Sequence, residues 1–107
     1  MFLSKINNSN CFCFRQLPNE PALHFNLANT LGKLNRYKDS ESHFLLATSL
    51  DPNNGNYWAN LGVLYHRWRK YDLAEKTYRH TLKLNPSLKS AQDNLNMLLK
   101  STGKTTR

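Results

Sequence analysis

The chain has 107 residues, enough for one small domain, and a formal net charge of +8 from 15 Lys and Arg against 7 Asp and Glu. Its longest apolar run, Phe44 to Ala47, is much shorter than the roughly 20 residues that a helix needs to cross a bilayer, which excludes a transmembrane span. The positive charge favours nucleic acid, anionic membranes or acidic peptides as partners. We favour a solvated basic surface instead, because Lys and Arg are spread along the chain with no interleaved run of aromatic residues.

Residues 1–17 form an irregular leader without helical or strand periodicity, and they contain both cysteines, Cys11 and Cys13. One intervening residue is too few for an unstrained disulfide, and two thiols are too few for zinc, so we expect free thiols. The leader lacks the apolar core of a signal peptide, which predicts a cytoplasmic protein if the chain is expressed as written. Residues 10–16 back-translate to a pyrimidine tract followed by a splice acceptor. We therefore interpret residues 1–16 as translated intron, with an ordinary leader as the alternative.

A helical pattern begins after Pro18. The first expected helix covers about 21–34, and its apolar stripe consists of Leu23, Leu27, Leu31 and Leu34. The second covers about 38–50, with Phe44, Ala47 and Leu50 facing inward. After a Pro- and Gly-containing turn, the pattern predicts helices over 56–68, 72–84 and 87–101, and a basic tail over 102–107.

Two segments of this helical pattern repeat each other. Residues 21–54 and 55–88 match at a shift of 34 residues, with identities such as Asn26/Asn60 and Tyr37/Tyr71. The second copy resembles a tetratricopeptide repeat at Trp58, Leu61, Gly62, Tyr65, Ala74, Tyr78 and Pro86. The resemblance implies an all-α solenoid of two helical hairpins, in which such repeats bind peptides in a concave groove.

Small residues are expected where the two helices of a hairpin cross. Gly62 in the second repeat and Ala28 in the first lie at this position, opposite Ala74 and Ser40. In the fifth helix, residues 89–101 continue the same phase, but the Trp and Gly positions hold Gln92 and Asn96. We therefore interpret this helix as a C-terminal cap.

One position of the first helix of each hairpin recurs as asparagine, at Asn26, Asn60 and Asn94. A carboxamide both donates and accepts hydrogen bonds, so three in register would hold the backbone of an extended peptide. The alternative is that each one hydrogen-bonds a neighbouring helix and orders the stack. The predicted peptide-binding groove comprises Asn26, Asn29, Asn60, Val63, Asn94 and Met97.

Some domains of this kind bind chaperone C-termini through a clamp of Lys, Asn, Asn, Lys and Arg. The matching positions here are Phe25, Asn29, Asn60, Ser90 and Asn94, so all three cations are absent. A carboxylate buried without its cation is poorly compensated. The sequence therefore argues against chaperone-tail docking by that mechanism.

The densest basic run is a candidate patch for an acidic or phosphorylated partner: His66, Arg67, Arg69 and Lys70. The four histidines do not have a metal-binding spacing, and no catalytic grouping is recognisable. We expect neither a metal nor another cofactor, and no enzymatic activity from this chain.

Residues 17–100 resemble one particular family beyond the generic repeat. The most specific string is Leu-Tyr-His-Arg-Trp at 64–68, and others are Leu-Pro-Asn at 17–19 and Tyr-Lys-x-Ser-Glu at 37–41. These strings are similar to the C-terminal repeats of the transmembrane and tetratricopeptide-repeat proteins, fourth type. That family implies an endoplasmic-reticulum membrane enzyme of protein O-mannosylation with a lumenal repeat array, whose catalytic membrane half has no counterpart in this sequence.

The resemblance implies that the chain is the end of a longer substrate-binding arm. A free cytosolic adaptor is the alternative, and a basic module for acidic ligands or nucleic acid is the third class. Leu23 and Leu34 are expected on a face that a preceding repeat would cover, and this face is also the candidate surface for self-association.

Overall fold

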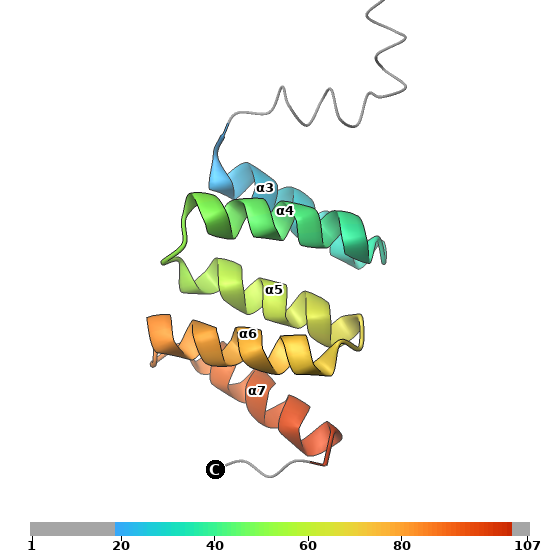
Figure 1. Ribbon diagram of the computed structural model, residues 1–107, viewed down its shortest axis with the longest axis vertical. Helices are drawn as coiled ribbons and strands as arrows, with labels where there is room; N and C mark the ends of the chain where they lie inside the picture. Colours follow the sequence, from blue (N-terminus) through green and yellow to red (C-terminus); the bar gives the residue numbers. More distant parts are fainter. Residues whose placement is uncertain (1–18, 104–107) are drawn as a thin grey trace, which may run out of the picture.

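The computed structural model describes residues 19–103. The leader with Cys11 and Cys13, the proposed splice junction and residues 104–107 of the basic tail lie outside this range. Within it every regular element is a helix, which confirms the all-α expectation. The elements are α3 (Pro21–Lys33), α4 (Tyr37–Leu50), α5 (Gly55–Arg67), α6 (Tyr71–Leu84) and α7 (Lys89–Ser101), stacked in chain order in Figure 1.

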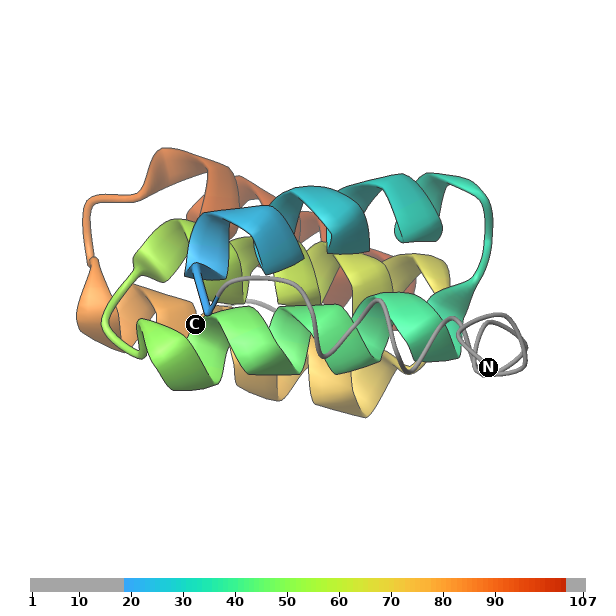
Figure 2. The same ribbon diagram turned by 90° about the horizontal axis from the view of Figure 1, so that it is seen from above.

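The helices form two layers. Helices α3 and α5 contact each other, as do α5 and α7, whereas α4 and α6 do not. Seen along the stack in Figure 2, α3, α5 and α7 lie on one side and α4 and α6 on the other. Because only the first layer is continuous, we call α3, α5 and α7 the inner layer.

The turns within the two hairpins have the same geometry. Asn35 and Arg69, one period apart, have left-handed backbones with φ of 63° and 65°. The amide of Arg36 donates to the carbonyl of Leu31, and that of Lys70 to the carbonyl of Tyr65, each at 2.9 Å. This is the Schellman pattern, which satisfies the last carbonyls of a helix and reverses the chain.

Close approach between the helices of each hairpin depends on small residues, as the sequence predicts. An ideal Cβ at Gly62 would lie 2.7 Å from two ring atoms of Tyr78, which is fully buried. In the first hairpin, the buried hydroxyl of Ser40 donates to the carbonyl of Ala28 at 2.7 Å. The Tyr78 ring therefore occupies the space that a side chain at residue 62 would need.

The leucine stripe of α3 is not the face that packs on α4. The face that packs on α4 consists of His24, Ala28 and Gly32, and the leucine stripe lies about 100° around the helix from it. Leu23 and Leu34 are 38% and 64% exposed, consistent with a face that no described helix covers. Leu27 and Leu31 of this stripe lie at the positions that Leu61 and Tyr65 occupy in the second repeat. In the second repeat, α4 covers those two residues.

Two expectations need correction. Leu50 is 40% exposed and does not face inward, because it lies about 120° around α4 from Phe44. The fifth helix begins at Lys89, two residues later than expected. Asn85 delays it by accepting hydrogen bonds from the Ser87 hydroxyl and the Leu88 amide, which hold a turn there.

Two histidines meet inside the first hairpin. The Nδ1 atoms of His24, which is buried, and His43 lie 3.2 Å apart, and the two rings stack. A hydrogen bond at this distance needs one protonated and one unprotonated nitrogen. Burial, and then the neighbouring His24, lower the pKa of His43 below its ordinary 6.5, against a smaller opposing effect of Asp39.

Replacing Gly62 with alanine should lower the free energy of unfolding by about 1–3 kcal/mol, because the new methyl group overlaps the Tyr78 ring. The matched control is Gly32→Ala, whose Cβ would meet the Ser40 hydroxyl at 3.4 Å; it should be neutral or stabilise by up to about 1 kcal/mol. Urea unfolding followed by circular dichroism measures both. Equal effects would contradict the overpacking at residue 62.

The histidine pair predicts a stability that falls in mild acid. Because the folded chain lowers the pKa of His43, the unfolded chain binds more protons below pH 6.5. The free energy of unfolding should therefore fall as the pH drops from 6.5 toward the folded pKa of His43. Urea titrations at pH 5–8 should show a smaller decrease for His43→Gln than for the original chain, whereas His80→Gln should keep the decrease. Identical pH profiles for all three would refute this coupling.

Candidate functional site

The residues predicted for a peptide groove all lie on the inner layer. Asn26 and Asn29 are on α3, Asn60 and Val63 on α5, and Asn94 and Met97 on α7. Asn26 and Met97 are exposed and the other four are half-buried, so all six retain surface that a ligand can contact. The 34-residue period places one asparagine at the same position of each of these helices.

Side-chain hydrogen bonds distinguish the three asparagines. The Asn60 carboxamide donates to the carbonyl of Asn56, one turn earlier in α5, at 2.9 Å. Its oxygen and second N–H make no hydrogen bond within residues 19–103, and neither do the side chains of Asn26 and Asn94. The one bond formed lies within α5 and does not tie α5 to a neighbouring helix.

Phe25, which lies where the carboxylate clamp has its first lysine, packs against aromatic rings. The Phe25 ring lies 4.7 Å from that of Tyr57 and 6.1 Å from that of Phe44, centroid to centroid. Phe25 thus joins α3 to α4 and α5, where a clamp would need a cation. This site supplies packing energy and no charge for a carboxylate.

Contacts with aromatic rings distinguish the residues of the basic run, of which Arg67, Arg69 and Lys70 are exposed. His66 is half-buried, with its ring in edge contact with Tyr71 and Tyr78, and the Lys70 ammonium lies 4.3 Å from the centroid of the Trp68 ring. Arg67 and Arg69 remain exposed at the α5–α6 turn. Aromatic contacts therefore engage two of the four predicted residues.

Three aromatic rings stack next to the α5–α6 turn. The Trp68 ring stacks between Tyr37 and Tyr65, at centroid distances of 5.6 and 6.4 Å. The Tyr65 hydroxyl donates to Glu41 at 2.6 Å, joining α5 to α4. Burial, together with this hydrogen bond, raises the pKa of Tyr65 well above its ordinary value, so the phenol stays protonated. These groups are structural.

The structure has a groove that the sequence did not predict. It lies between α6 and α7, and we call it the α6–α7 groove. Its lining residues are Arg79, Leu82 and Lys83 of α6 with Gln92, Leu95, Asn96 and Leu99 of α7. The signal was present in the polar residues at the Trp and Gly positions of α7, but they indicated only a cap.

Within residues 19–103, no His, Cys, Asp and Glu side chains cluster as a metal site would require. None of the described helices is long and apolar enough to cross a membrane.

Comparison with family models identifies both hairpins. Residues 21–54 and 55–88 each match a tetratricopeptide repeat, and together the two matches cover more than half of the chain.

Curated relatives carry the name protein O-mannosyl-transferase. F38B6.6 of Caenorhabditis elegans is 33% identical over 82 residues, which is 77% of this chain and 12% of that protein. TMTC4 of Mus musculus is 42% identical over 52 residues, or 49% of this chain and 7% of that protein. The human TMTC4 is 46% identical over 43 residues, 40% of this chain and 6% of that protein. The chain thus spans about a tenth or less of these relatives.

Solved structures share the fold. The crystal structure of MamA superposes with a TM-score of 0.75 at 15% identity, covering 79% of this chain and 50% of that one. The first TPR of Spaghetti (RPAP3), bound to the HSP90 peptide SRMEEVD, superposes with a TM-score of 0.74 at 24% identity, covering 81% of this chain and 69% of that one. At these identities the likeness establishes the solenoid fold.

Arg69 carries a backbone strain that its counterpart Asn35 tolerates, because asparagine adopts the left-handed region more easily than arginine. Arg69→Asn should therefore raise the free energy of unfolding by about 0.5 kcal/mol. Arg67→Asn removes the same charge from the last turn of α5, where the backbone is helical, and should not raise the free energy of unfolding. Urea unfolding of both variants tests this, and a loss on replacing Arg69 would show that its side chain stabilises the turn.

Proposed function

The chain belongs to the tetratricopeptide-repeat family, and on that premise we propose that it binds an extended peptide of a partner protein along its inner layer. Repeats of this kind are protein-interaction modules whose stacked helices form long binding surfaces. The likeness to O-mannosyl-transferases covers only 6–12% of those proteins, and we assign to this chain binding and no chemistry.

The main observation behind this proposal is that asparagine carboxamides of the inner layer have hydrogen-bond donors and acceptors available to a ligand. Asn26, Asn60 and Asn94 lie one on each of three successive helices, and their side chains retain donors and acceptors. Peptide backbone offers matching groups at every residue, whatever its side chains. Because the local bond of Asn60 lies within α5, it orients the carboxamide without joining the helices. These features support backbone recognition with tolerance of ligand sequence.

The ligand should differ from the chaperone peptide that the RPAP3 domain binds. Phe25, Ser90 and Asn94 replace the three cations of the clamp, and Phe25 is packed against aromatic rings. A terminal carboxylate would lose hydration there without gaining a charged partner. A peptide of sequence SRMEEVD should therefore show no saturable binding.

The wider setting we propose is protein O-mannosylation in the endoplasmic reticulum, with the repeats on the lumenal side engaging the polypeptide to be modified. The 33–46% identity to O-mannosyl-transferases supports this setting over a free cytosolic adaptor. Long-read sequencing of transcripts that cross the Leu17 codon tests it. Reads continuing upstream into membrane-spanning exons support the setting, whereas transcripts that all start at Met1 support the adaptor.

Asn60→Ala should weaken peptide binding about tenfold, because it removes one or two hydrogen bonds to the ligand backbone. The probe is a peptide selected by this chain from a random phage-displayed pool and labelled for fluorescence anisotropy. Asn53→Ala, in the exposed α4–α5 turn, is the matched control and should bind normally.

The melting temperature of each variant separates binding from stability. An Asn60→Ala variant that melts like the original chain but binds weakly supports the proposal. Unchanged binding, or a loss of binding that merely follows a lower melting temperature, would overturn it. Binding that falls steeply with salt would point instead to a basic module for acidic ligands or nucleic acid.

A further inference from the structure

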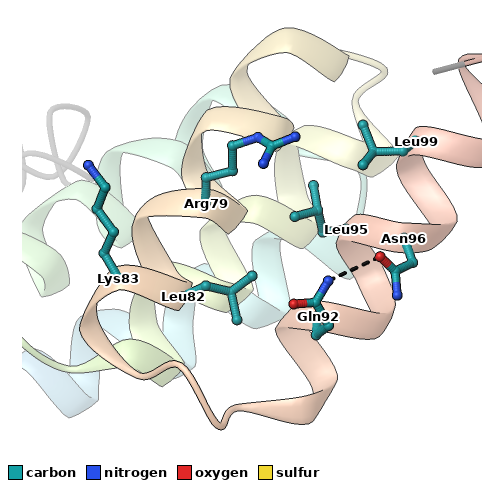
Figure 3. A pocket seen from close by; sticks show the side chains of 7 residues that line it. All are labelled: Arg79, Leu82, Lys83, Gln92, Leu95, Asn96 and Leu99. Carbon is teal, nitrogen blue, oxygen red and sulfur yellow. Dashed lines mark hydrogen bonds between the residues drawn. The ribbon is translucent and has the colours of Figure 1, made fainter. Parts of the chain in front are cut away.

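The α6–α7 groove is the place where the repeat pattern stops. Helix α4 packs on α3 and α6 packs on α5, but within the described residues α7 contacts only α5 and α6. The groove that remains has a volume of about 380 Å³. Figure 3 shows its lining side chains extending from the two helices, with Leu82 and Leu95 between them.

The groove combines an apolar floor with two chemically different walls. Leu82, Leu95 and Leu99 form the floor, of which Leu82 is half-buried and the other two are buried. On the α7 wall, the Gln92 carboxamide donates to that of Asn96 at 3.0 Å, as drawn in Figure 3. The α6 wall bears Arg79 and Lys83, one turn apart, and no acidic side chain is among the lining residues.

The two cations differ in their surroundings. The Arg79 guanidinium is held by Glu75 through its Nε and Nη2 atoms, both at 3.0 Å, which fixes its position beside the groove. Lys83 is exposed and makes no ion pair within residues 19–103. A ligand in the groove therefore meets one cation that Glu75 holds in place and one exposed cation that no carboxylate within residues 19–103 pairs with.

Another repeat helix cannot occupy the groove as α6 occupies its place on α5. At Gly62 even a methyl group would overlap Tyr78, and Asn96 lies at the corresponding position of α7 with a full carboxamide. A helix at that spacing would also bury both the Asn96 and Gln92 amides against apolar side chains. The occupant must be slimmer than a helix and must offer polar groups to this wall.

We propose that the α6–α7 groove binds an extended acidic peptide segment that carries one leucine-sized apolar side chain. The apolar side chain lies on the Leu82 floor, and flanking carboxylates lie against Arg79 and Lys83. Backbone groups of the ligand pair with the Gln92 and Asn96 amides. Charge complementarity selects this occupant, because the groove has two cations and no anion in its lining and the chain has a net charge of +8.

The test uses a fluorescein-labelled probe peptide in which a central leucine is flanked by two glutamates on each side. Binding to the full chain is followed by ¹H–¹⁵N NMR, which detects weak complexes and locates them. Shifts are expected at the amides of Lys83, Gln92 and Asn96, and not at Asn26 or Asn60 of the inner layer. Replacing the glutamates with glutamines, or the leucine with alanine, should weaken binding several-fold.

Matched variants test the role of the cations. Arg79→Gln combined with Lys83→Gln should weaken binding about tenfold, because two partly exposed ion pairs are lost. Lys38→Gln combined with Lys76→Gln removes the same charge from exposed positions of α4 and α6 outside the groove, and should change binding less than twofold. Thermal melting of both variants verifies that they fold.

Equal weakening by the two double variants, shifts confined to the inner layer, or no saturable binding would each overturn the proposal. Its failure would leave the inner-layer proposal intact, since that rests on Asn60 and a different probe.

Discussion

The close approach of paired helices at small residues is the constraint on which the rest of the structure depends. Tyr78 fills the space over Gly62, and the Ser40 hydroxyl binds the backbone at Ala28. Each contact sets how near the second helix of a hairpin lies to the first. The next hairpin then packs on the surface that this pair presents. The two layers, and the continuity of the inner one, follow from repeating that contact at a fixed period.

Within residues 19–103, α7 lacks the small residue found at the other helix crossings, and only α5 and α6 pack on it. Asn96 occupies the Gly62 position of α7, so the closest helix pairing is excluded there, and the polar amides of Gln92 and Asn96 remain near solvent. The substitution that caps the repeats thereby leaves the α6–α7 groove beside two cations. One local change in polarity thus accounts for the polar surface of α7 and for the ligand-binding role that we propose for this groove.

Packing also decides which polar and basic residues remain for recognition. His66 and Phe25 contact aromatic rings of the interior, so these two positions of a basic patch and a carboxylate clamp contribute to packing. Lys70 contacts the Trp68 ring and remains exposed. The inner-layer asparagines keep hydrogen-bonding capacity because other residues of each helix form its buried face. Local sequence identifies residue types, whereas neighbouring helices determine which side chains face a ligand.

The helices, the 34-residue period and the small residues at the crossings can be predicted from the sequence, because they depend on local spacing and side-chain volume. The sequence wrongly placed Leu50 of α4 inward, and it identified Ala28 but not His24 as part of the face of α3 that packs on α4. It gave no sign of the His24–His43 contact or of the α6–α7 groove. These features depend on how each helix is rotated about its axis relative to its neighbours, because that rotation sets burial, pKa shifts and grooves. Periodicity along one helix does not determine the rotation, so these features are found only once the helices are packed together.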